Sequence, residues 1–139
     1  MPLRHDIWRV GVVAAPIAEL LVSGAIGRRE IAWLPFEARD FAFLADPFGL
    51  WRDGKLHLFA EAYDYRTRHG RIDLLILDEG FAVADRRTVL VEPWHLSYPF
   101  VFEGDGETWM LPEAHRSGRL TLYRAAAFPD RWEAATSYG

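Results

Sequence analysis

The chain contains an internal repeat of about 50 residues, and this repeat limits the folds that are open to it. Residues 44–62 (LADPFGLWRDGKLHLFAEA) align without a gap with residues 96–114 (LSYPFVFEGDGETWMLPEA), at an offset of 52. Further along, residues 70–74 align with residues 118–122 at an offset of 48. A repeat of this length, made of short strands around a turn, is typical of a β-propeller blade.

An Asp-Gly pair lies at the centre of each copy, as Asp53-Gly54 and as Asp105-Gly106. Between runs of alternating apolar residues this pair predicts a tight hairpin, because Asp and Gly tolerate the positive φ angles of the turn. We therefore expect a first blade over 41–92 and a second blade over 93–139. The expected strands are 45–52, 55–61, 71–77 and 88–91 in the first blade, and 108–112 and 119–124 in the second. A turn is expected at 128–133, leading into the last segment of the chain.

The first 40 residues do not copy the repeat, and we interpret them as an incomplete N-terminal unit. Strands are expected over 7–13 and 30–36, with a short helix over 15–22 that ends at Ser23-Gly24. The chain would then be one all-β domain over 1–139, a partial propeller of two to three four-stranded blades. Closed propellers have four to eight blades, so this chain is either part of a longer propeller or a unit of a homo-oligomer. A small twisted β-sandwich is the alternative.

Composition excludes several classes of function. The net charge is −4, and this gives no basic excess for nucleic acid or an anionic membrane. Without cysteine there are no disulfides or thiolate metal sites, and the five histidines lack zinc-ligand spacing. No apolar run reaches the roughly 18 residues of a membrane span, and no signal peptide is predicted, which favours a cytoplasmic location. We expect no cofactor and no metal.

Acidic residues recur at matching places in the repeat. Glu61 is equivalent to Glu113, Asp46 is equivalent to Tyr98, and His95 precedes Tyr98 by three residues. Paired carboxylates can act as general acid and base on a glycosidic bond, or accept hydrogen bonds from sugar hydroxyls. The pattern therefore predicts Asp46 and Glu113 as candidate catalytic residues, and Glu61, His95 and Tyr98 as substrate contacts. Structural roles are equally open, because Asp before Pro often sits in a turn and a repeated Glu can join two blades through a salt bridge.

The motifs F-L-A-D-P-F-G (43–49) and D-G-K-L-H-L-F-A-E (53–61) resemble the first blades of five-bladed glycosidase-type propellers. That class includes arabinanases, xylosidases and invertases. The resemblance implies that Asp46 would serve as general base or nucleophile.

A closer resemblance is to the N-terminal propeller-like domain of glucosamine inositolphosphorylceramide transferases and their bacterial polysaccharide-biosynthesis relatives. The motifs that carry it are A-D-P-F (45–48), W-H-L-S-Y-P-F-V-F (94–102), P-E-A (112–114), L-Y-R-A (122–125) and F-P-D-R-W (128–132). It implies a carbohydrate-recognising or carbohydrate-processing module of polysaccharide or glycolipid biosynthesis, with a glycan or nucleotide-sugar-derived substrate.

The resemblance leaves catalysis open, because in that family glycosyltransferase chemistry belongs to a separate domain. The chain would be a glycosidase-like enzyme or an accessory to a glycosyltransferase or formyltransferase. A glycoside hydrolase with paired carboxylates and a non-catalytic assembly module remain the alternatives.

Overall fold

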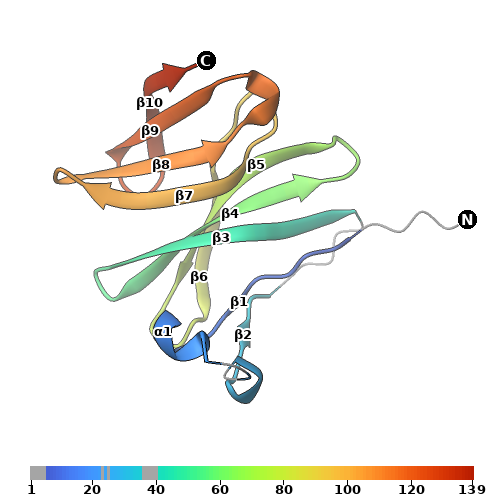
Figure 1. The fold of residues 1–139 in the computed structure, drawn as a ribbon, viewed down its shortest axis with the longest axis vertical. Helices are drawn as coiled ribbons and strands as arrows, with labels where there is room; N and C mark the ends of the chain where they lie inside the picture. Colours follow the sequence, from blue (N-terminus) through green and yellow to red (C-terminus); the bar gives the residue numbers. More distant parts are fainter. Residues whose placement is uncertain (1–5, 23, 25, 36–40) are drawn as a thin grey trace, which may run out of the picture.

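The computed structural model describes residues 6–22, 24, 26–35 and 41–139, and it is almost entirely antiparallel β-structure (Figure 1). The elements are β1 (Gly11–Val12), α1 (Ile17–Leu20), η1 (Ile26–Arg28), β2 (Ala32–Trp33), β3 (Ala42–Arg52), β4 (Lys55–Asp64), β5 (His69–Leu77), β6 (Val83–Leu90), β7 (Ser97–Gly104), β8 (Glu107–Glu113), η2 (His115–Ser117), β9 (Leu120–Ala127) and β10 (Arg131–Tyr138). β1 pairs with β2. The first sheet is β3-β4-β5-β6 and the second sheet is β7-β8-β9-β10, each with neighbouring strands in chain order.

The hairpin at the start of each sheet turns where the Asp-Gly pairs predict it. The φ angles are 53° and 70° at Asp53 and Gly54, and 54° and 77° at Asp105 and Gly106. Both residues of each turn are left-handed, as in the hairpin turns whose twist matches that of the strands. The predicted turn geometry is confirmed in both copies.

Each of these hairpins also contains a bulge at the same place in the repeat. In the first sheet the pairing runs to Ala45 opposite Glu61 and resumes only at Phe48. In the second sheet Ser97 lies opposite Glu113, and the pairing resumes at Phe100. Asp46 and Tyr98 occupy the bulges, each with a φ angle of 49°. Bulges of this kind often re-aim a side chain next to a functional site.

The two sheets pack face to face around a shared apolar core. β7 contacts β3 and β4, and the second sheet (orange to red) lies beside the first sheet (teal to yellow) in Figure 1. The core residues are Phe59, Ile72, Leu74 and Leu90 of the first sheet, Leu96 of the connection, and Val101, Met110, Ala114, Tyr123 and Trp132 of the second sheet and its loops.

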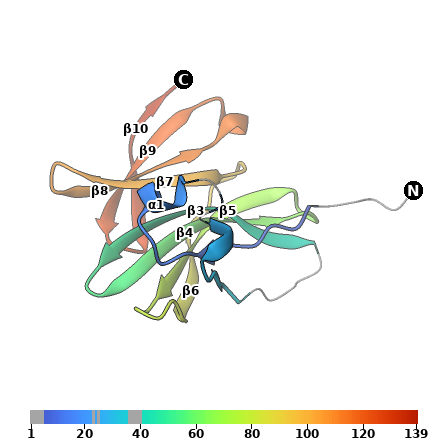
Figure 2. The ribbon, with the colours of Figure 1, turned by 60° about the horizontal axis from the view of Figure 1, so that its bottom comes forward.

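The other face of the first sheet packs against the N-terminal segment. Figure 2 shows this segment (blue) running along the first sheet. Val10 and Leu34 join a second core with residues of β3, β4 and β5: Leu44, Leu56, Leu58, Ala60, Ala62, Leu75 and Leu77. The N–H of Leu34 donates to the carbonyl of Val10 at 3.0 Å, and this bond holds the segment together. Because both faces are covered, β4 is buried almost without interruption.

The second sheet is covered on one face only. In β8 buried residues alternate with half-buried ones, the pattern of a strand with one open face. On the open side Phe100 and Leu120 are 44% and 49% exposed. The described residues thus form two stacked four-stranded sheets and one two-stranded sheet, and no closed propeller.

The all-β class is confirmed, and α1 lies inside the predicted helical stretch. Ser23 and Phe36, predicted to end the helix and the following strand, lie outside the described residues. β6 begins earlier than predicted, at Val83, because its exposed polar residues do not show the apolar pattern that marks a strand. No helix among the described residues is long and apolar enough to cross a membrane.

Candidate functional site

Two carboxyl groups, those of Asp46 and Glu61, meet where β3 bulges away from β4. The carboxyl groups of Asp46 and Glu61 interact with each other, and Glu61 is only 6% exposed. Burial is the main reason that the pKa of Glu61 rises, and the charge and hydrogen bond of Asp46 and then the charge of Glu113 raise it further, to about 7. Glu61 therefore keeps a proton over part of the neutral range, and it can donate that proton to the Asp46 carboxylate.

His95 reaches Glu61 from the connection between the two sheets. Its Nδ1 atom accepts a hydrogen bond from the N–H of Gly70 at 2.8 Å, so the proton of the neutral ring sits on Nε2. That Nε2 atom lies 3.5 Å from Oε1 of Glu61. Burial, with the charge of Arg116 as the next cause, lowers the pKa of His95 and favours the neutral ring. The three side chains form a chain of groups that can hold and exchange protons.

Gly70 lets His95 approach this closely. A Cβ atom on residue 70 would lie 2.5 Å from the carbonyl oxygen of Leu96 and 2.7 Å from the His95 ring. Real side chains do not tolerate such contacts with backbone, so only glycine fits at this position without a shift of the connection. Gly70, which aligns with Gly118 in the repeat, therefore has a local structural reason in the first copy.

A hollow of about 330 Å³ opens beside the carboxyl pair, between the N-terminal segment and the start of β3. It is lined by Trp8, Arg9, Val10, Phe43, Ala45, Asp46, Pro47 and Glu61. Trp8 is 59% exposed, which leaves a large ring surface available at the rim. The ring of Phe43 stacks on Tyr63 with centroids 5.0 Å apart. The hollow thus combines acidic groups, one arginine and aromatic walls.

Glu113 and Tyr98 do not line this hollow. Glu113 is exposed on the second sheet and accepts a hydrogen bond from the Ser97 hydroxyl at 3.4 Å. Tyr98 is half-exposed and packs its edge on the ring of Phe48, with centroids 4.8 Å apart. Of the five residues singled out from the sequence, Asp46, Glu61 and His95 are therefore brought together. Glu113 acts on Glu61 through its charge.

Sequence reasoning missed the contribution of Trp8 and Arg9. Both belong to the predicted N-terminal strand, but they lie outside the repeat, so the repeat did not mark them. The Arg9 guanidinium lies 5.2 Å from the centroid of the Trp33 ring, a cation–π contact that links the residues before β1 to β2. An adjacent Trp and Arg in a strand outside the repeat was the available signal.

The chemistry of the site follows from this geometry. A carboxyl pair that shares a proton can both accept hydrogen bonds from hydroxyl or amino groups and donate one. Asp46 and Glu61 can therefore bind polar groups of both kinds. Among the residues that the structure describes, no three acidic or histidine side chains are grouped to hold a metal ion.

Comparison with known proteins gives a family. The sequence model described as glucosamine inositolphosphorylceramide transferase 1, N-terminal, matches residues 4–136. The chain belongs to this family.

Glucosamine inositolphosphorylceramide transferase 1 of Arabidopsis thaliana is 42% identical over 92 residues, which are 66% of this chain and 12% of that protein. The protein of the same name from Oryza sativa subsp. japonica is 42% identical over 91 residues, 65% of this chain and 12% of its own length. The aligned region is thus a small part of these relatives. No solved structure matches the chain.

Proposed function

We propose that this chain is a carbohydrate-recognising module of glycolipid or polysaccharide biosynthesis. The observation that carries the proposal is the hollow beside Asp46 and Glu61, with its paired carboxyls and aromatic rim. Family membership supports it, since the relatives are named glucosamine inositolphosphorylceramide transferases. The ligand class is a sugar, and an amino sugar suits the site best.

The hollow has the groups that a sugar needs. Carboxylate oxygens accept hydrogen bonds from sugar hydroxyls, and they attract a protonated amino group more strongly than a neutral one. Trp8 offers an exposed aromatic face against which the apolar side of a sugar ring can pack. The proton on Glu61 adds a donor to the carboxyl pair, which would otherwise only accept.

We further propose that the sheets are blades of a partial propeller, each packed head to tail on the next. Leu74 of the first sheet is fully buried against the second sheet, and its repeat equivalent Leu122 lies on the open face of the second sheet. The same relation holds between Ile72, fully buried, and Leu120. The open face thus carries the apolar residues that the first sheet uses to bind its neighbour. A third sheet of this kind, from further chain or from another copy, would cover it.

Calorimetric titration with glucosamine, glucose and myo-inositol tests the sugar site. The wild-type chain is expected to bind at least one of these, with glucosamine preferred. Asp46→Asn keeps the shape of the side chain but removes its charge, and it should weaken binding by about tenfold, the effect of losing one charge-assisted hydrogen bond. Glu107→Gln changes an acid that pairs with Arg124 on the second sheet, away from the hollow, and it should bind as the wild type does. No binding by the wild type, or equal binding by Asp46→Asn, would reject the site.

Glycoside hydrolysis is the second candidate function, and the raised pKa of Glu61 is the observation that favours it. A carboxyl group that is protonated near neutral pH is suited to protonate a leaving oxygen. Asp46 and Glu113 would then act as base or nucleophile. The candidate predicts slow hydrolysis of aryl glycosides that Asp46→Asn and Glu113→Gln abolish. Absence of turnover across a broad aryl glycoside panel would leave recognition as the function.

A further inference from the structure

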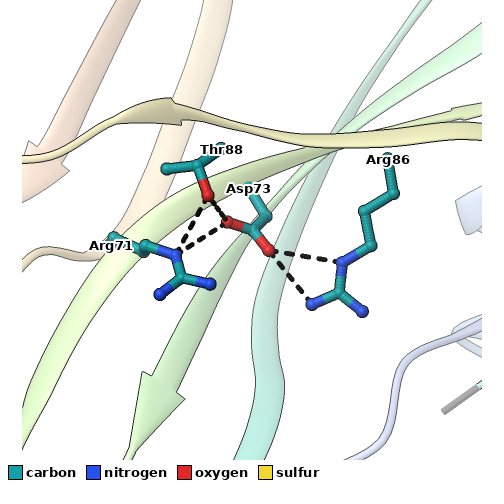
Figure 3. Close-up of polar contacts among 4 residues, drawn as sticks. All are labelled: Arg71, Asp73, Arg86 and Thr88. Carbon is teal, nitrogen blue, oxygen red and sulfur yellow. Dashed lines mark hydrogen bonds and ion pairs between the residues drawn. The ribbon is translucent and has the colours of Figure 1, made fainter. Parts of the chain in front are cut away.

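A second polar cluster lies on the first sheet, away from the carboxyl hollow. Figure 3 shows Asp73 on β5 between the guanidinium groups of Arg71 and Arg86, with Thr88 beside it. Arg71 Nε lies 3.2 Å from Asp73 Oδ1. Arg86 Nη2 lies 3.0 Å from Asp73 Oδ2. The Thr88 hydroxyl donates to Asp73 Oδ1 at 2.8 Å and accepts from Arg71 Nε at 3.0 Å. Asp73 itself is 3% exposed.

The repeat shows that the fold does not need a charge at this position. Asp73 is equivalent to Thr121 of the second sheet at the offset of 48. Asp73 pairs across the strands with Thr88, and Thr121 pairs with Ser137 in the same way. There the two hydroxyl groups bond to each other at 3.0 Å. A neutral pair is thus sufficient, whereas burying a carboxylate is costly unless cations pair with it.

The consequence of the buried carboxylate is that two arginines are held in place. Asp73 and Thr88 engage Nε of Arg71, and Asp73 engages Nε and Nη2 of Arg86. Within the described part of the chain, the Nη1 and Nη2 groups of Arg71 make no hydrogen bond. The Nη1 group of Arg86 makes none either. The two side chains are 48% and 38% exposed, so these donors are accessible from outside.

The arginines face a hollow of about 390 Å³. It is lined by Pro35, Arg71, Asp73, Leu75, Val83, Arg86, Arg87 and Thr88, and it shares no residue with the carboxyl hollow. Arg87 is already paired with Asp85 at 2.7 Å and with Asp130 at 3.3 Å. The charges of Arg71, Arg86 and Asp73 add up to one net positive charge, in a chain whose overall charge is −4.

We propose that this hollow binds a phosphate group through Arg71 and Arg86. Guanidinium groups bind phosphate oxygens through paired N–H donors, and an arginine fixed by a carboxylate loses less conformational freedom when it does so. Asp73 is the positioning residue of the site, since it holds both arginines and does not touch the ligand. The proposal adds a second site to the sugar hollow, and it stands whether or not that hollow binds sugar.

Two probes test the proposal and separate the two sources of a phosphate group. Inorganic phosphate, followed by calorimetry, stands for a soluble phosphate ester. Phosphatidylcholine vesicles with and without phosphatidic acid, followed by co-sedimentation, stand for a lipid headgroup. We expect the wild type to bind at least one phosphate probe. Arg71→Met and Arg86→Met should each weaken that binding by about tenfold, the loss of a charge-assisted contact.

Arg119→Met is the matched control, because Arg119 is exposed and is the repeat equivalent of Arg71. It should bind as the wild type does. Should the methionine variants fail to fold, Arg71→Lys and Arg86→Lys keep the charge next to Asp73 but lack the planar fork, and they should also bind more weakly. The proposal is overturned if the wild type binds neither probe, if Arg119→Met loses as much binding, or if both lysine variants bind as tightly as the wild type.

Discussion

His95 Nε2 lies 3.5 Å from Oε1 of Glu61, so the residue that leads into the second sheet touches the acid at the end of the first hairpin. Gly70 permits this contact and donates its N–H to the other ring nitrogen. Glu113 holds the equivalent place in the second sheet, where it is exposed and meets only the Ser97 hydroxyl among the described residues. In the proposed propeller, the connection into a following sheet would cover Glu113 as His95 covers Glu61.

The raised pKa of Glu61 predicts a specific pH dependence of stability. The folded state holds this proton up to about pH 7, whereas the unfolded chain releases it near pH 4.5. The folded state therefore binds more protons between these values, and the contribution of Glu61 to the free energy of unfolding falls as the pH rises through that window. Glu61→Gln mimics the protonated group. The free energy of unfolding of this variant, relative to that of the wild type, should rise by on the order of 3 kcal/mol between about pH 4 and about pH 8.

Chemical denaturation of both chains across that pH range measures this difference. Comparison with the wild type cancels the titration of His57, which both proteins share. Glu107→Gln, on the hairpin of the second sheet, serves as the control and should follow the wild-type profile. A constant difference between Glu61→Gln and wild type at all pH values would contradict the account of Glu61.

Gly70→Ala should destabilise the chain, because the new Cβ would lie 2.5 Å from the Leu96 carbonyl oxygen and 2.7 Å from the His95 ring. We expect a loss of about 2 kcal/mol or more in the free energy of unfolding, as for other overpacked sites. Gly27→Ala is the control, since none of the described residues lies within 4 Å of its added Cβ. Urea denaturation of the two variants should separate them. Equal stability would show that the connection before β7 is not tightly packed.

The repeat provides a matched pair of leucines for the packing of the sheets. Leu74→Ala removes a fully buried side chain from the core between the sheets, and it should cost about 2–5 kcal/mol. Leu122→Ala makes the same change at the equivalent position on the open face, and in this chain it should cost less than about 1 kcal/mol. Urea denaturation of the monomeric variants measures both losses in the free energy of unfolding. If the two losses were equal, the open face would already be covered, and the head-to-tail arrangement would be wrong.

Trp8 and Trp51 form a second matched pair, with exposed fractions of 59% and 56%. Only Trp8 lines the carboxyl hollow. Trp8→Ala should weaken sugar binding by several-fold, because the ring face that packs on the sugar is lost, whereas Trp51→Ala should leave it unchanged. Calorimetric titration of both variants with glucosamine measures the effect. A loss in Trp51→Ala and none in Trp8→Ala would move the site elsewhere.

The repeat predicted the two hairpins correctly, because the turn geometry of Asp53-Gly54 and Asp105-Gly106 is local and depends on residue type. The outermost strands were harder to predict. β6 contains Asp85, Arg86 and Arg87 in succession, and an exposed strand needs no apolar alternation once its neighbour supplies the backbone partners. The bulges at Asp46 and Tyr98 were not predicted, since a gapless alignment of two copies contains no sign of a pairing shift within each copy.

The candidate site was predicted in part. The repeat pointed to Asp46 and Glu61, and the structure brings them together with His95. The repeat could not indicate Trp8, because the packing of the N-terminal segment on the first sheet depends on long-range contacts of Val10 and Leu34. The arginine cluster around Asp73 was missed for a similar reason. Its members come from two strands, and only their pairing register makes them neighbours.

The central claim is that a sugar binds at the carboxyl pair, and backbone amide NMR of the chain during titration with glucosamine tests it most directly. The account predicts saturable shifts at the amides of Asp46 and Glu61 and at the Trp8 indole N–H, and an about tenfold higher glucosamine concentration at the midpoint for the Asp46→Asn variant. Shifts that map to other surfaces, or no shifts at saturating glucosamine, glucose and myo-inositol, would contradict it.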